Sequence, residues 1–97
     1  MATKTPAKYL DIGILVLRQL ADDLTFFTAD EWWPRFEAAC AQYGVDTSQR
    51  DASGAVFTRA YREGIVRKVP GRYRRSTRPA AHAKMLPLLT RGTAPVA

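Results

Sequence analysis

Basic side chains are concentrated in one stretch of the chain, between Arg59 and Arg78. This stretch holds eight lysine and arginine residues and one acid, Glu63, so its net charge of +7 exceeds the +6 of the whole chain. Guanidinium and ammonium groups neutralise phosphate and donate hydrogen bonds to its oxygens. The stretch therefore predicts a partner that carries phosphate.

The same inventory of reactive residues offers little for catalysis or metal binding. The chain has a single cysteine, Cys40, and a single histidine, His82, which are too few for a structural zinc site. The sequence shows no paired carboxylates with a nearby base, no glycine-rich phosphate loop and no pattern of a nucleophile with a histidine. We therefore expect a non-enzyme without cofactor or metal.

Length and composition favour one small globular domain. The 97 residues are 46% hydrophobic and 25% charged, which is ordinary for a folded protein. Residues 1–48 carry a net charge of −3 and residues 49–97 a net charge of +9, so one face is expected to be strongly positive. The longest apolar run, Ile14 to Leu17, is far shorter than a membrane span, and a lone cysteine suits a reducing cytoplasm.

Three helices are predicted ahead of the basic stretch. The first runs from Lys8 to about Leu24, where apolar residues recur at intervals of three and four. Its apolar face is broad, which suggests contact on two sides or with a partner. Gly13 lies in the middle of this helix and suggests close packing, because glycine otherwise weakens a helix.

Capping residues mark the ends of the other two helices. Thr28 and Glu31 have the spacing of a capping box, and Gly44 suits a left-handed helix end, so the second helix is expected between them. A second capping pattern at residues 48–51 starts the third helix, which is expected to end at Gly64.

The second helix is expected to bury a stripe of apolar side chains. Pro34 should kink its first turns, because proline removes a hydrogen bond from the helix interior. The members of the stripe are either Trp32 or Trp33, with Phe36, Ala39, Cys40 and Tyr43. The other tryptophan is expected to be exposed.

Extended structure is predicted before the second helix and after Gly64. Leu24 to Phe27 can form no more than one small strand. After Gly64 two registers remain open, and in the first Val69 to Arg72 is a tight turn between two strands. In the second, which we favour, residues 65–69 lead into a strand from Arg72 to Ser76, and Lys84 to Leu89 returns beside it. Thr90 to Ala97 is expected to be a tail.

This order of elements is that of a winged helix-turn-helix, a mainly α fold with a small β-hairpin (α+β). It would occupy residues 8–90, with tails at 1–7 and 91–97. In such a fold the outer face of the third helix enters the major groove of DNA and the hairpin, or wing, contacts the backbone. The expected DNA contacts of the helix are Ser48, Arg50, Asp51, Gly54, Thr58, Arg59 and Arg62. The expected contacts of the wing are Arg67, Lys68, Arg72, Arg74, Arg75 and Arg78.

Three segments resemble small winged-helix DNA-binding proteins of actinobacterial phages. They are Phe27 to Asp30, Gly54 to Ile65 and Tyr73 to His82. The resemblance implies a winged-helix fold, a wing loop from Ser76 to His82, and action in the cytoplasm of a bacterial host. Residues 83–89 depart from the family's pattern, which would place a glycine beside the histidine and a tryptophan near the end of the strand.

We expect a double-stranded DNA-binding protein, either a regulator or an accessory factor of replication or recombination. One alternative is a module that engages a host or phage protein, favoured by the broad face of the first helix and the adjacent Trp32 and Trp33. A homodimer formed through the first helix would pair two DNA-reading surfaces. Another alternative is binding of RNA or single strands, with Tyr73 stacking on bases among the arginines.

Overall fold

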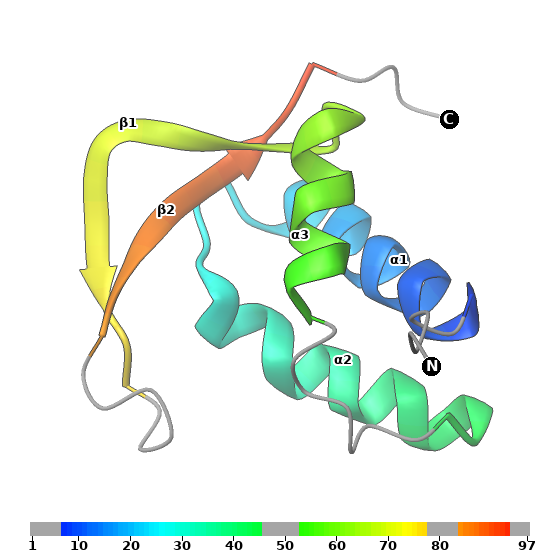
Figure 1. The fold of residues 1–97 in the computed structure, drawn as a ribbon. Helices are drawn as coiled ribbons and strands as arrows, with labels where there is room; N and C mark the ends of the chain where they lie inside the picture. Colours follow the sequence, from blue (N-terminus) through cyan, green and yellow to red (C-terminus); the bar gives the residue numbers. More distant parts are fainter. Residues whose placement is uncertain (1–6, 46–52, 78–83, 94–97) are drawn as a thin grey trace, which may run out of the picture.

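Three helices precede an antiparallel pair of strands in the computed structural model of the chain (Figure 1). The structure describes residues 7–45, 53–77 and 84–93. The helices are α1 (Ala7–Asp23), α2 (Ala29–Tyr43) and α3 (Ser53–Arg62), and the strands are β1 (Val66–Arg75) and β2 (Met85–Arg91). The predicted α+β class, with three helices and one hairpin, is confirmed.

Helix α1 packs against both other helices, which explains its broad apolar face. The close packing predicted at Gly13 is confirmed, because a Cβ added there would lie 2.7 Å from both Cγ atoms of Val56 on α3 and 3.3 Å from the Trp32 ring on α2. The indole N–H of Trp32 also donates to the Gly13 carbonyl oxygen at 3.1 Å. Gly13 is therefore the point at which the three helices meet.

Helix α2 begins and ends where its capping residues predict. The Thr28 hydroxyl accepts from the Asp30 N–H at 3.1 Å, and the Glu31 carboxylate accepts from the Thr28 N–H at 2.7 Å, which completes the capping box. At the other end Gly44 adopts a left-handed φ of 67°. The helix runs without interruption through Pro34.

The buried stripe of α2 is confirmed in its centre and wrong at its end. Trp32, Phe36 and Cys40 are buried, and the rings of Trp32 and Phe36 stack with centroids 4.3 Å apart. Burial raises the pKa of the Cys40 thiol, which keeps it a protonated core residue. Tyr43 is instead exposed, because it lies at the last position of α2. The expected exposure of one tryptophan is also wrong, since Trp33 is half-buried and packs edge-on against Trp32.

Helix α3 packs on α1 through Val56 and Ala60. Its expected first turn, residues 48–52, lies outside the described residues. The helix closes at Gly64, whose φ of 72° is left-handed as expected, and the Ile65 N–H returns to the Ala60 carbonyl oxygen at 2.9 Å.

The hairpin combines parts of both predicted registers. The favoured pairing of Tyr73 to Arg75 with the returning strand is confirmed, because Tyr73 lies opposite Pro87 and Arg75 opposite Met85. The expectation that residues 65–69 merely lead in is wrong, since Val66 to Lys68 pair with the other half of β2.

A bulge replaces the tight turn of the other register. Between Lys68 and Tyr73, four residues of β1 face Leu88 alone on β2. Gly71 supplies a left-handed φ of 69° inside this bulge. Strand β1 therefore turns sharply here and divides the hairpin into a half beside the helices and a distal half (Figure 1).

The C-terminal tail begins later than predicted. Thr90 and Arg91 belong to β2, and the Gly92 N–H donates to the Ile65 carbonyl oxygen at 3.0 Å. The Thr90 hydroxyl donates to the Thr25 carbonyl oxygen at 2.7 Å. These bonds fasten the end of β2 to the segment that follows α1.

The short strand predicted near Phe27 is reduced to one β-bridge. Phe27 exchanges two backbone hydrogen bonds with Leu89, of 3.0 and 2.7 Å. Strand β2 therefore lies between β1 and Phe27.

We expect Gly13→Ala to destabilise the protein even though alanine favours helices. The gain in helix propensity is roughly 1 kcal/mol, whereas overpacking costs about 1 to 3 kcal/mol. Val56 is branched at Cβ and cannot easily rotate away. The measurement is thermal unfolding followed by circular dichroism, in which the midpoint should fall.

Gly54→Ala is the matched control, because a Cβ added at Gly54 meets nothing within 4 Å. Its unfolding midpoint should stay the same or rise. Equal changes in both variants would contradict the tight contact at Gly13.

Candidate nucleic-acid interface

The N-terminus of α2 holds the distal half of the hairpin. One carboxylate oxygen of Asp30 accepts from the Ser76 hydroxyl at 2.7 Å, and the other accepts from the Thr77 N–H at 2.8 Å. The Glu31 carboxylate accepts from Nη1 of Arg74 at 2.8 Å. We call these contacts, made by Asp30, Glu31, Arg74, Ser76 and Thr77, the hairpin clamp.

Glu31 belongs to both the capping box and the hairpin clamp. Its Oε2 accepts from the N–H and the hydroxyl of Thr28, at 2.7 and 2.8 Å, while its Oε1 binds Arg74. Thr28 is fully buried, so this carboxylate is anchored on one side by a rigid group. The orientation of the distal hairpin therefore depends on how α2 begins.

Ion pairs neutralise several arginines on the helices and at the ends of the hairpin. The pairs are Arg35 with Asp23, Arg59 with Glu63 and Asp11, Arg74 with Glu31, and Arg91 with Asp22. Arg59 shows the effect most clearly, because the hydrogen bond and negative charge of Glu63 raise the pKa of its guanidinium above the usual value. A paired arginine has less capacity to attract phosphate.

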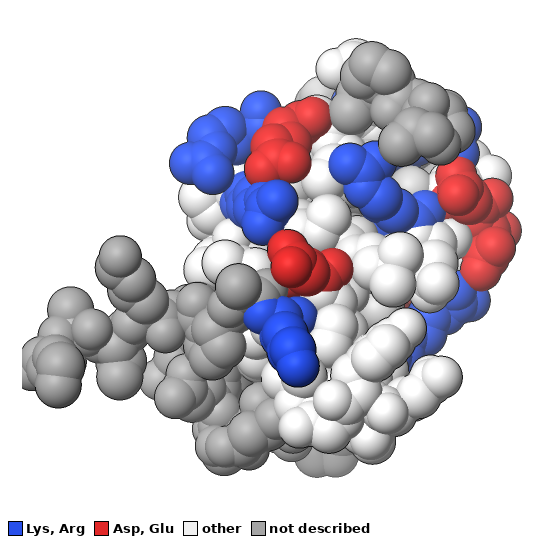
Figure 2. Space-filling model, turned by 90° about the vertical axis from the view of Figure 1, so that its right-hand side faces the viewer, with Lys and Arg blue, Asp and Glu red and all other residues white. Residues whose placement is uncertain are grey.

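Other basic side chains form no ion pair within the part of the chain that the structure describes. They are Lys8, Arg18, Arg62, Arg67, Lys68, Arg72, Arg75 and Lys84. All except Lys8 and Arg18 lie at the end of α3 or on the hairpin. On the opposite side of the molecule, basic and acidic side chains lie next to one another (Figure 2). Positive charge without compensation is thus concentrated around the hairpin.

The predicted contacts of the third helix are described only in part. Ser48, Arg50 and Asp51 lie outside the described residues. Gly54, Thr58 and Arg62 are exposed, and their spacing of four places them on one face of α3. Arg59 does not join them as a free cation, because it is half-buried and paired with Glu63 at 2.7 Å.

The predicted contacts of the hairpin divide into two groups. Arg67, Lys68, Arg72 and Arg75 are exposed and form no ion pair among the described residues, although Lys68 Nζ lies 5.2 Å from the centre of the Tyr61 ring. Arg74 differs, because the hairpin clamp holds its guanidinium against Glu31. Arg78 lies outside the described residues.

Sequence reasoning missed Lys84 and the second role of the acidic pair. Lys84 is exposed beside the start of β2, where its carbonyl oxygen accepts from the Ser76 N–H at 2.8 Å. Asp30 and Glu31 were interpretable as residues of a helix start, and their partners lie more than 40 residues away in the sequence. The only hint in the sequence was the pair of hydroxyl residues, Ser76 and Thr77, that follows two arginines. Such a pair does not reveal which carboxylates it will bind.

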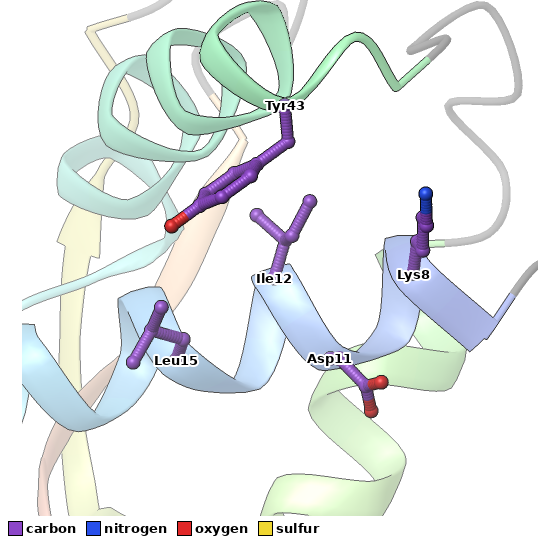
Figure 3. A pocket seen from close by; sticks show the side chains of 5 residues that line it. All are labelled: Lys8, Asp11, Ile12, Leu15 and Tyr43. Carbon is purple, nitrogen blue, oxygen red and sulfur yellow. The ribbon is translucent and has the colours of Figure 1, made fainter.

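A shallow groove of about 220 Å³ lies between α1 and the C-terminal end of α2 (Figure 3). Its lining residues are Lys8, Asp11, Ile12, Leu15 and Tyr43. The Tyr43 ring reaches across from α2 toward the α1 residues Ile12 and Leu15. Since the hairpin clamp lies at the other end of α2, this groove is separate from the basic surface.

The two observations that favoured a protein-interaction module both have an intramolecular explanation. The broad face of α1 is divided between α2 and α3. Trp32 is fully buried, and Trp33 packs against Trp32 and Phe36.

No family model, curated protein or solved structure matches this chain. Across residues 7–45, 53–77 and 84–93, no helix combines the length and the apolar character of a membrane span. Within those same ranges, histidine, cysteine and acidic side chains do not gather into a group of three that could bind a metal ion. The geometry of the hairpin and α3 is therefore the basis for a functional proposal.

We expect Asp30→Ala to loosen the distal hairpin while the helices stay folded. The substitution removes the acceptor of the Ser76 hydroxyl and the Thr77 N–H, and losing the partner of a partly buried donor costs about 1 to 3 kcal/mol. Amide hydrogen exchange measured by NMR should become faster at Thr77 and in the distal half of β1.

Asp23→Ala is the control, because Asp23 makes an exposed ion pair with Arg35 that contributes roughly 1 kcal/mol or less. Exchange in the hairpin should be unchanged in this variant. Unchanged exchange at Thr77 in Asp30→Ala would show that the clamp does not restrain the hairpin.

Proposed function

We propose that the protein binds double-stranded DNA as a winged helix-turn-helix. In this proposal the exposed face of α3 enters the major groove and the hairpin is the wing, which lies against the phosphate backbone. The order of elements supports it, as does the bridge of Phe27 to Leu89 beside the hairpin. A regulator and an accessory factor of replication or recombination are both compatible with this mode of binding.

The uncompensated charge around the hairpin carries the proposal. Acidic partners neutralise some arginines, as in the pairs Arg35 with Asp23 on the helices, Arg74 with Glu31 in the hairpin clamp and Arg91 with Asp22 at the end of β2. By contrast, six cations of the wing and the end of α3 have no such partner within the described residues. They are Arg62, Arg67, Lys68, Arg72, Arg75 and Lys84. Phosphate groups at the spacing found in DNA would supply the missing negative charge.

The outer face of α3 is suited to close approach. Gly54 and Ala55 are exposed near its start, and no described side chain lies within 4 Å of the position that a Gly54 Cβ would occupy. Small residues let a helix backbone come near base edges in a groove about 12 Å wide. Thr58 and Arg62, on the same face as Gly54, would then donate to bases or phosphates.

We expect duplex binding to weaken steeply with salt. If about five cations neutralise phosphates, the plot of log K against log salt concentration has a slope of about −4.5. In the double variant Arg67→Gln with Arg72→Gln, the slope should become shallower by about two units, because each lost phosphate contact contributes about 0.9. The measurement is fluorescence anisotropy with a labelled duplex at several salt concentrations.

Arg35→Gln is the matched control, since this arginine on α2 is already paired with Asp23. It should leave the slope unchanged. A wild-type protein that does not bind duplex at low salt, or a double variant with the wild-type slope, would overturn the proposal.

A further inference from the structure

Backbone alternation divides the side chains of the distal hairpin between two faces. Arg74 points toward α2, where it binds Glu31 at 2.8 Å. Because successive side chains of a strand point to opposite faces, Tyr73 and Arg75 point away from α2. Their partners across the sheet are Pro87 and Met85, which share that face. We call these four residues the outer face of the hairpin.

The outer face exposes apolar surface that no other element covers among the described residues. Tyr73 is 62% exposed and Met85 is 52% exposed, although the protein buries most of its other large apolar side chains. Arg75 lies next to them, exposed and without an ion pair in the described part of the chain. An aromatic ring can stack on a nucleobase, and an unpaired guanidinium beside it can bind the phosphate next to that base.

An intact duplex does not present what this face could bind. Paired bases are stacked on one another and offer only their edges in the grooves. Inside a duplex both faces of each base are covered by its neighbours, so a base lies flat on a tyrosine ring most readily where it is unpaired, as in a single-stranded extension. The hairpin clamp holds the strand that carries Tyr73, so the ring is positioned before the base arrives.

We propose that Tyr73 stacks on an unpaired DNA base while Arg75 holds the adjacent phosphate, so that the protein prefers a duplex with a single-stranded extension to a blunt duplex. The inference rests on the proposed binding of DNA by the hairpin. It adds a ligand class, the junction between double-stranded and single-stranded DNA, and it assigns the recognition of this junction to the outer face.

The experiment compares a duplex that has blunt ends with the same duplex that carries a four-nucleotide single-stranded extension at either a 5′ or a 3′ end. Affinities are measured by fluorescence anisotropy at one salt concentration. A 2-aminopurine at the first unpaired position reports stacking through its fluorescence. Wild-type protein should bind an extended duplex more tightly and quench the 2-aminopurine.

We expect Tyr73→Ala to lower affinity for the extended duplex by about 5- to 150-fold, the range for loss of one aromatic stacking partner. Binding of the blunt duplex should change by less than about 2-fold, and the quenching should be lost. Tyr73→Phe keeps the ring and should retain both the preference and the quenching. Arg75→Gln should weaken binding of both duplexes, because it removes a phosphate contact.

Tyr43→Ala is the control for loss of an exposed tyrosine. Tyr43 is 58% exposed and ends α2, whereas the clamp lies at the start of that helix. It should change neither affinity nor quenching. Circular dichroism should show unaltered folding in Tyr73→Ala and in Tyr43→Ala.

Two results would overturn the inference: equal affinity of the wild-type protein for blunt and extended duplexes, or an equal loss on both in Tyr73→Ala. The proposed function fails differently, through absence of blunt-duplex binding or a salt slope unaffected by the Arg67 and Arg72 substitutions. A protein that binds the extended duplex in a Tyr73-dependent way, but does not bind the blunt duplex, would contradict the proposed function and support the stacking site.

Discussion

The position of the hairpin depends on two neighbouring carboxylates at the start of α2. Asp30 and Glu31 together bind one guanidinium, two hydroxyls and one backbone N–H of the distal hairpin. Without them, the distal half would be joined to the rest of the fold only through its two strands, of which β1 is interrupted by a bulge. Because Glu31 also completes the capping box, an ordinary helix start also fixes the direction of the hairpin. Arg74 therefore positions the hairpin, whereas the neighbouring cations that form no ion pair among the described residues are free to bind phosphate.

The helical part rests on a second constraint, the absence of a side chain at Gly13. A close contact between α1 and Val56 of α3 sets where α3 lies, and hence where its exposed face lies relative to the hairpin. Trp32 fills the remaining space and hydrogen-bonds to the backbone of α1. The surface we assign to DNA thus combines a helix placed by apolar packing with a hairpin placed by charged hydrogen bonds.

Local signals in the sequence were enough to predict both ends of α2, the end of α3 and the pairing of the distal hairpin. Thr28, Gly44 and Gly64 act through their own backbone neighbours, so their effect can be recognised within a few residues. The partners of Asp30 could not be predicted, nor could it be predicted that Arg74 and not Arg75 pairs with Glu31. Both depend on contacts between segments 40 or more residues apart. Tyr43 followed the helical period of its stripe, but it is the last residue of α2 and its ring lies in the open groove beside α1. Net charge alone could not distinguish paired arginines from available ones.

The placement of Pro87 in β2 has a consequence for how this protein behaves at high concentration. Leu89 directs its N–H and carbonyl group toward Phe27, away from β1. Backbone groups of a strand alternate in direction, so Pro87, two residues earlier, faces that same edge. Proline has no N–H, which means that this edge lacks one of the donors that a strand of another molecule would need in order to add to the sheet. A residue that costs the hairpin no internal hydrogen bond thereby protects it against edge-to-edge aggregation.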